Sequence, residues 1–260
     1  LPDWALLVPK AIAICLVLVS MLAVAALTGM ATQLAQGFIQ IHPDRYLFWY
    51  IIPSAIDWSL LAILAVFVQA VSPNKFIGWG VLILVLVGRL VLPRLGYDHA
   101  LYLYGGKPAY PGFNGEPLSD MNGQGNFAAI AAWFRAYWTA FAVMLMVLAY
   151  ALWPRGGAWQ MRARLRRLPS RLRGPAGVIG ALALAAFVGL GAYIFENTNI
   201  QNEHRTRIAD EKWLADYEKT FLRYEKLPQP SVTDVTLDLD LRPHAPRLTA
   251  EGVFRLVNDS

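Results

Sequence analysis

The sequence has one cysteine, Cys15, and lacks the short motifs that indicate phosphate binding, metal binding or nucleophilic catalysis. A single cysteine excludes a disulfide framework or a cysteine metal site within the chain. There is no G-x-x-x-x-G-K-S/T phosphate loop, no H-E-x-x-H zinc helix, and the four histidines are too scattered for a Ser/His/Asp set. We therefore expect no catalytic residue, metal or cofactor in this stretch, and whether the protein is an enzyme stays open.

A solvated basic surface with interleaved aromatic residues is also lacking, which argues against nucleic acid as a partner. The net charge is +5, and much of the basicity lies in one segment, 154–174, which has no acidic residue. Its seven arginines are Arg155, Arg162, Arg164, Arg166, Arg167, Arg171 and Arg173. We interpret them as determinants of topology and as contacts for anionic lipid.

Long apolar runs dominate what is present, since 56% of the residues are hydrophobic. A helix of about 20 residues crosses a bilayer, and the expected spans are 11–30, 47–71, 76–92, 128–153 and 175–195. Short arginine-rich loops between spans stay on the cytoplasmic side. We thus predict an all-α polytopic membrane protein with five transmembrane helices, its N-terminus inside, its C-terminus outside, and residues 93–126 as an outer loop.

The last part of the chain, 196–260, is soluble in character. Apolar residues recur at helical spacing over 207–226, and apolar and polar residues alternate over 232–241, with a second strand expected at 248–257. Two strands form a hairpin that is too small to fold alone. We expect an outer helix followed by the start of a β-sheet domain, and a chain that is a piece of a longer protein.

Three ionisable residues fall inside expected spans: Asp57, Arg89 and Arg135. Charged groups in hydrocarbon are costly and usually face a partner or water. We predict an ion pair between Asp57 and Arg135, either as a structural element or as part of a transport path. Arg89 lies close enough to the outer interface for its guanidinium to reach water.

Four polar residues of the outer loop, Asp98, His99, Asp120 and Asn122, are candidates for a second site. A histidine beside an aspartate can bind metal, but this spacing is unspecific. Asp and Asn commonly stabilise turns, so a loop-stabilising role is the favoured interpretation.

A family resemblance rests on four stretches. The segment Tyr193–Pro243 resembles the junction in bacterial fusion proteins in which a type-2 ABC exporter permease precedes a periplasmic domain similar to zinc aminopeptidases of the aminopeptidase N type. Val66–Gly80, Ser119–Gly125 (SDMNGQG) and Trp133–Gly156 look like the permease part. The resemblance covers nearly all of the chain, and the junction and the SDMNG motif are its more specific parts.

The resemblance implies that the first four spans are the third to sixth of one permease half. It implies a short helical re-entrant hairpin in the outer loop, and an added fifth span that delivers the following domain to the periplasm. The implied partners are a dimeric cytoplasmic ABC ATPase carrying ATP and Mg, and a second permease half or a missing N-terminal half of the same chain. Zinc would belong to a downstream peptidase-like domain.

The expected function is therefore that of a permease subunit of an ATP-driven exporter in a bacterial inner membrane, with its C-terminal tail in the periplasm. Two alternatives stay open. One is a membrane-anchored zinc aminopeptidase whose spans do not transport, and the other is a non-catalytic membrane assembly protein.

Overall fold

The computed structural model describes residues 3–108, 116–119, 121, 123–153, 161–227, 230–242 and 247–258. The chain divides into two compact units, Leu1–Ile208 and Ala209–Ser260. Five helices of the described chain are long and apolar enough to cross a membrane, which confirms the number of long apolar helices predicted from the sequence.

The first unit is mainly helical. In chain order its elements are α1 (Trp4–Ala35), α2 (Pro43–Arg45), the π-helical η1 (Tyr46–Ile51), α3 (Ile52–Val71), α4 (Lys75–Val91), the 3₁₀ turn η2 (Leu92–Leu95), α5 (Gly125–Ala151), α6 (Met161–Arg171), α7 (Pro175–Phe195) and the π-helical η3 (Glu196–Ile200). The second predicted span is one continuous helical rod, because α2, η1 and α3 follow each other without a break.

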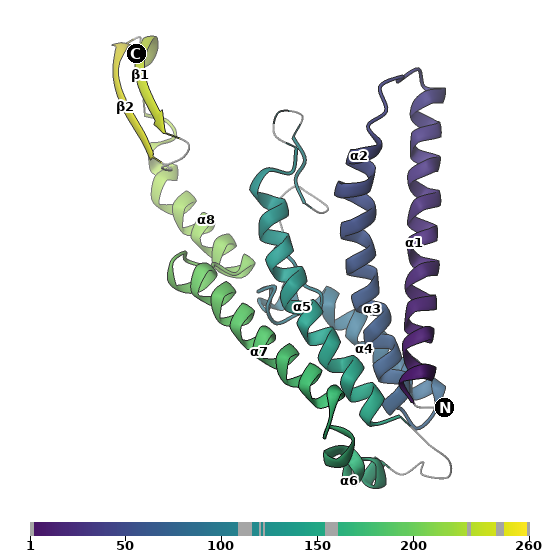
Figure 1. Ribbon diagram of the computed structural model, residues 1–260. Coiled ribbons are helices and arrows are strands. Elements are labelled where there is room, and N and C mark those ends of the chain that lie inside the picture. Colours follow the sequence, from purple (N-terminus) through teal and green to yellow (C-terminus); the bar gives the residue numbers. More distant parts are fainter. Residues whose placement is uncertain are drawn as a thin grey trace. The chain divides into compact units, whose positions relative to one another are not determined.

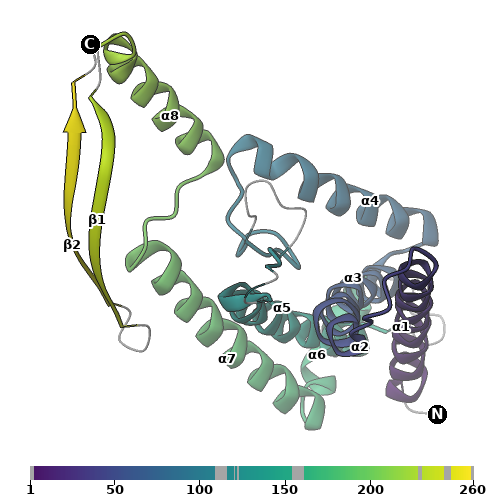
Figure 2. The same ribbon diagram turned by 90° about the horizontal axis from the view of Figure 1, so that it is seen from above.

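Four long helices pack in the order α1, α3, α5 and α7, and α4 packs against α3 (Figures 1 and 2). The most buried helix of the five is α5. Its aromatic residues Phe134, Tyr137 and Trp138 form the centre of the core with Leu60 of α3. Most large apolar side chains of α1, α4 and α7 point outward and stay exposed, as expected of helices whose solvent is lipid or another membrane helix.

Small residues bring α5 and α7 together, as the glycine- and alanine-rich composition of the fifth span predicts. A Cβ at Gly191 would lie 2.9 Å from Cε2 of Tyr137, and one at Gly180 would lie 3.3 Å from Cγ1 of Val147. The ring of Tyr137 stacks on Phe187 at 4.4 Å between centroids. Glycine at position 191 is therefore needed for the closest approach of these two helices.

The long helices alternate in direction, which gives the unit two distinct ends. At one end Leu7 near the start of α1 packs with Ala70 and Ala149 near the ends of α3 and α5, and we call this end, which includes α6, the arginine end. The other end holds the starts of α3 and α5, the ends of α4 and α7, and the described residues of 96–124; we call it the loop end (Figure 1).

Three features differ from the sequence predictions. Helix α1 begins at Trp4 rather than near Ala11, so Lys10 lies inside the helix with its ammonium 5.4 Å from the ring centroid of Trp153. The segment predicted as an arginine-rich linker contains a helix, α6. The described residues between η2 and α5 form turns and no helix, so the helical re-entrant hairpin that the family resemblance implies is not seen among them.

The second unit contains most of α8 (Arg207–Phe221), η4 (Leu222–Tyr224), β1 (Ser231–Arg242) and β2 (Arg247–Val257). The strands pair antiparallel, with Val235 opposite Phe254 and Leu241 opposite Leu248, so the predicted hairpin is confirmed. Because side chains alternate across a strand, one face carries these four apolar residues together with Leu237 and Leu239. All six are exposed, which leaves an apolar sheet face uncovered.

Candidate functional site

Four charged residues meet at the loop end of the first unit. Asp57 lies on α3 and Arg135 lies on α5, while Lys107 and Glu116 come from the segment between η2 and α5. Asp57 and Arg135, the two residues predicted to pair, lie in contact. The side chain of Arg135 is 9% exposed and that of Glu116 is also 9% exposed, so both charges are largely removed from solvent.

Arg135 is the hub of this charge network. Its Nε donates to Oδ1 of Asp57 at 3.1 Å, and its Nη2 donates to Oδ2 of the same carboxylate at 3.3 Å. Nη2 also donates to Oε1 of Glu116. The planar guanidinium matches the two carboxylate oxygens, which makes a bidentate arginine–carboxylate pair stronger and more directional than a lysine pair.

Lys107 closes the network from the loop. Its Nζ lies 2.7 Å from Oδ2 of Asp57 and 3.4 Å from Oε1 of Glu116. Two cations therefore face two anions, and the network carries no net charge. Removing one partner of a buried ion pair costs about 3–5 kcal/mol because the other charge is left uncompensated. The network thus fixes the loop to α3 and α5 as long as every member is present.

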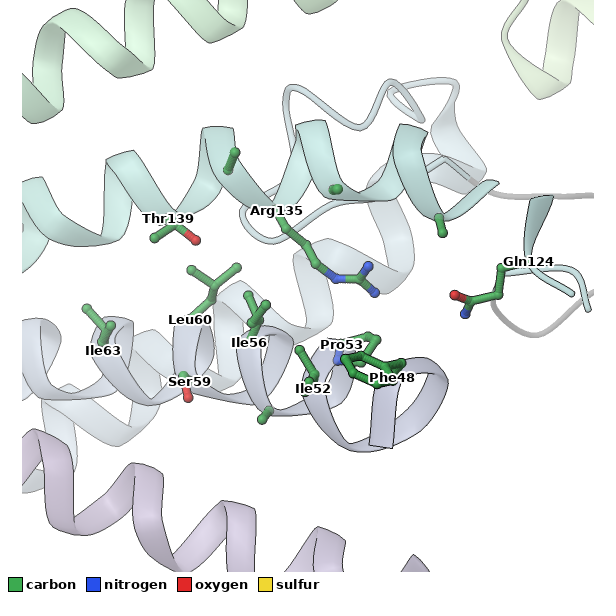
Figure 3. A pocket seen from close by; sticks show the side chains of 14 residues that line it. Phe48, Ile52, Pro53, Ile56, Ser59, Leu60, Ile63, Gln124, Arg135 and Thr139 are labelled. Atoms are coloured by element: carbon green, nitrogen blue, oxygen red, sulfur yellow. The ribbon is translucent and has the colours of Figure 1, made fainter. Parts of the chain in front are cut away.

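An open groove lies beside Arg135 between α3 and α5, with a volume of about 810 Å³ (Figure 3). Its walls are mainly apolar and include Ile56 and Leu60 of α3. Arg135, Gln124 and Thr139 add polar groups on the side of α5 (Figure 3). Such a groove accommodates an apolar group, and the guanidinium that lines it is bonded to Asp57 and Glu116.

Further bonds attach the loop to the spans. The hydroxyl of Tyr104 donates to the backbone oxygen of Leu60 at 2.7 Å, and its ring packs against Trp138 and Phe141 of α5. Arg89 of α4, predicted to reach the interface, donates through Nη2 to the backbone oxygen of Gly105 at 3.4 Å. The loop is therefore bonded to α3, α4 and α5.

A second cluster joins the loop to the end of α7. Nε2 of His99 lies 3.2 Å from the Thr198 hydroxyl and 3.0 Å from Nδ2 of Asn199. Nδ1 of His99 accepts from the backbone N–H of Leu101 at 3.1 Å. Both ring nitrogens of His99 therefore have hydrogen-bond partners, one in the loop and the others at the end of α7. Burial, followed by the nearby His204, lowers the pKa of His99, and Asp98 offsets part of that effect.

Asp98 connects the same cluster to the segment before α8. Its Oδ2 accepts from the backbone N–H of Arg207 at 2.7 Å, and its Oδ1 lies 3.5 Å from Nε2 of His204. A carboxylate at this position caps the first turn of α8. Asp98 and His99 therefore bond the loop to the end of α7 and to the start of α8. Asp120 and Asn122 lie outside the described residues.

The described part of the chain contains no group of three or more histidine, cysteine or acidic residues arranged to hold a metal ion. The rings of His99 and His204 lie edge to face, with centroids 4.5 Å apart. The four residues of the charge network compensate one another's charges.

At the arginine end, two arginines of α6 contact the ends of other helices. Nη1 of Arg164 donates to the backbone oxygen of Ala70 at 3.0 Å. Nη1 of Arg171 donates to the oxygens of Tyr150 and Ala151 at 3.1 and 3.4 Å, and its Nη2 lies 3.1 Å from Oδ2 of Asp3. The last carbonyls of a helix lack partners within it and carry partial negative charge. Both arginines thus have a role that sequence reasoning did not assign, while Arg155 lies outside the described residues.

Sequence reasoning also missed Lys107 and Glu116. Both lie in a loop that the sequence places outside the membrane, where a charged residue needs no explanation. The charges of Asp57 and Arg135 within expected spans indicate that further charged partners are needed. Sequence spacing alone does not identify which loop residues reach them.

Comparison with known proteins yields no match: no protein-family model, no curated protein and no solved structure is similar to the chain at a significant level.

Proposed function

We propose that this chain is the membrane part of an ATP-driven exporter subunit, similar to a type-2 ABC permease. The observation that carries the proposal is the charge network around Arg135 in the outer part of two adjacent spans, beside an open groove of about 810 Å³. Ionisable residues within spans generally mark substrate or ion pathways when they are not purely structural. The five apolar helices fit this role.

The proposed orientation places the arginine end in the cytoplasm and the loop end in the periplasm of a bacterial inner membrane. Support comes from the charges, since α6 and its flanks carry the densest set of arginines in the chain and basic residues collect on the cytoplasmic side. The same orientation sends the C-terminus of α7, and the tail beyond it, to the periplasm.

In this proposal, the charge network acts as the outer closure of the path. Lys107 and Glu116 belong to the loop, and their ion pairs with Asp57 and Arg135 hold it over the starts of α3 and α5. A separate dimeric ATPase, with ATP and Mg, would drive the re-packing of the spans. Opening the closure would separate the loop carboxylate from Arg135 and expose the guanidinium to the substrate in the groove.

The tail is proposed to be the start of a periplasmic domain of the aminopeptidase N type. The exposed apolar face of the β1–β2 hairpin supports this, because a hairpin with one apolar face needs further strands or a packed layer to be stable. Zinc, if the complete domain binds it, would be held by residues other than those of this stretch.

Affinity purification of the full-length protein in mild detergent tests the proposal. We expect an ABC ATPase to co-purify and to hydrolyse ATP in lipid, and we expect Arg135→Gln to uncouple hydrolysis from substrate export. If no ATPase subunit co-purifies and the protein cleaves peptides in a reaction that a chelator inhibits, the function is that of a membrane-anchored peptidase and not of an exporter. Absence of both activities would favour the assembly protein.

A further inference from the structure

The arginines of α6 fall into two sets with different surroundings. Arg164 and Arg171 face the helix ends of the bundle, and Arg164 is only 5% exposed. Arg162, Arg166 and Arg167 are exposed on other sides of α6. Positions 162 and 166 are neighbours on one helix face, four residues apart. The exposed set therefore projects from a helix that the buried set fixes in place.

The exposed arginines make no ion pair with any described residue. The surrounding sequence explains this, because residues 121–195 contain no aspartate and no glutamate. Asp3, the acidic residue that does reach α6, pairs with Arg171 instead. Three guanidinium groups thus lack an anion from the described residues of their own part of the chain, and their natural complement is an external anion.

The buried set also determines the depth of α6 in the membrane. Ala70 is in the last turn of α3, and Tyr150 and Ala151 end α5. Hydrogen bonds to these three residues hold α6 where two apolar spans stop, which is the level of the lipid head groups. Leu165, 53% exposed between Arg162 and Arg166, can enter the acyl boundary while both guanidinium groups reach phosphates.

We infer that α6 is a binding site for the phosphate groups of anionic lipids in the leaflet at the arginine end, formed by Arg162, Arg166 and Arg167. Guanidinium groups bind phosphate oxygens through two parallel hydrogen bonds, and the fixed helix presents them without further ordering. The site depends only on the membrane location of the spans and holds whether or not the protein transports. Arg164 and Arg171 are positioning residues for it.

The test uses the full chain in nanodiscs of phosphatidylcholine with increasing phosphatidylglycerol, and native mass spectrometry counts the lipids retained. The variant is Arg162→Gln with Arg166→Gln and Arg167→Gln. A matched control removes three positive charges from the second unit by Lys212→Gln, Arg223→Gln and Lys226→Gln. The thermal midpoint in phosphatidylcholine alone checks folding, and Arg166→Gln alone serves if the triple variant is unstable.

We expect the triple variant to need at least about tenfold more phosphatidylglycerol for half-maximal retention, because each basic residue near an anionic surface contributes about 1 kcal/mol. The control should retain phosphatidylglycerol like the wild type, and Arg166→Gln alone should show a smaller loss in the same direction. Equal retention by the triple variant would overturn the inference and favour an acidic protein partner for α6. The inference would also be overturned if the control variant lost as much phosphatidylglycerol as the triple variant. It would be overturned as well if the wild type retained phosphatidylcholine and phosphatidylglycerol equally.

Discussion

The two ends of the first unit hold their charges in different ways. At the loop end, Lys107 and Arg135 face Asp57 and Glu116 in a neutral network. At the arginine end, Arg164 and Arg171 bind mainly backbone oxygens at helix ends, and neighbouring arginines stay exposed. A neutral network can be broken and re-formed within the protein, whereas an excess of one sign requires an external anion. The loop end thus balances its charges within the chain, whereas the arginine end carries an excess of positive charge.

Breaking the hub of the loop-end network should have the largest effect. Arg135→Gln leaves Asp57 and Glu116 with Lys107 as their one cation among the described residues, and we expect a loss of about 3 kcal/mol in the free energy of unfolding. Denaturant titration in mixed micelles measures it. Adding Asp57→Asn to Arg135→Gln should recover part of the loss, because one uncompensated charge disappears. If Arg135→Gln and Asp57→Asn each behave as wild type in both stability and transport, the network has neither a structural nor a transport role.

At the arginine end, Arg164→Gln should cost about 2 kcal/mol, because it removes a charged hydrogen bond to a buried carbonyl. Hydrogen exchange should then increase at the end of α3 and in α6, and remain unchanged at the loop end. The exposed neighbour Arg166→Gln is the matched control and should leave exchange at the end of α3 unaltered. A uniform increase along the whole chain would mean that α6 is not held by this contact.

Lys107→Gln tests the loop side of the network and should have a smaller effect than Arg135→Gln. The lysine is 30% exposed on its side chain, so water replaces part of the lost interaction, and we expect a loss of about 1 kcal/mol. Limited proteolysis should show faster cleavage of the segment between η2 and α5. Stability as low as in Arg135→Gln would show that the lysine, not the arginine, is the hub.

The smallest effect concerns pH at the loop end. The pKa of His99 is lowered by burial and by His204, so the folded protein favours the neutral ring. Stability should therefore be greatest above pH 6.5, the ordinary value for histidine, and fall as the pH drops from there through the lowered pKa. His99→Gln should flatten this dependence when thermal midpoints are compared between about pH 7.5 and pH 5. A dependence that persists unchanged in His99→Gln would assign it to another group.

Local patterns in the sequence determine most of the fold. Apolar run length predicts all five long helices, and alternation predicts the β1–β2 hairpin, because both depend on residues close in sequence. The contact between Asp57 and Arg135 follows from the cost of isolated charges in a membrane. Other contacts join residues that are far apart in sequence, and no sequence periodicity predicts them. They are the pairing of Lys107 and Glu116 with the spans, the cluster around His99 and the bond from Arg164 to a helix end. The start of α1 at Trp4 does not follow from the apolar run, because the charged Lys10 interrupts that run before Ala11.

The central claim is that the two ends lie on opposite sides of the membrane, with the arginine end in the cytoplasm. Labelling of single cysteines with a membrane-impermeant maleimide tests it most directly, in a Cys15→Ser background. Met121→Cys reports on the loop end, where position 121 is 98% exposed, and Ser170→Cys reports on exposed α6. We predict that, in cells whose outer membrane alone is permeabilised, Met121→Cys reacts and Ser170→Cys reacts only after the inner membrane is lysed. Reaction of both, or of Ser170→Cys alone, before that lysis would contradict the account.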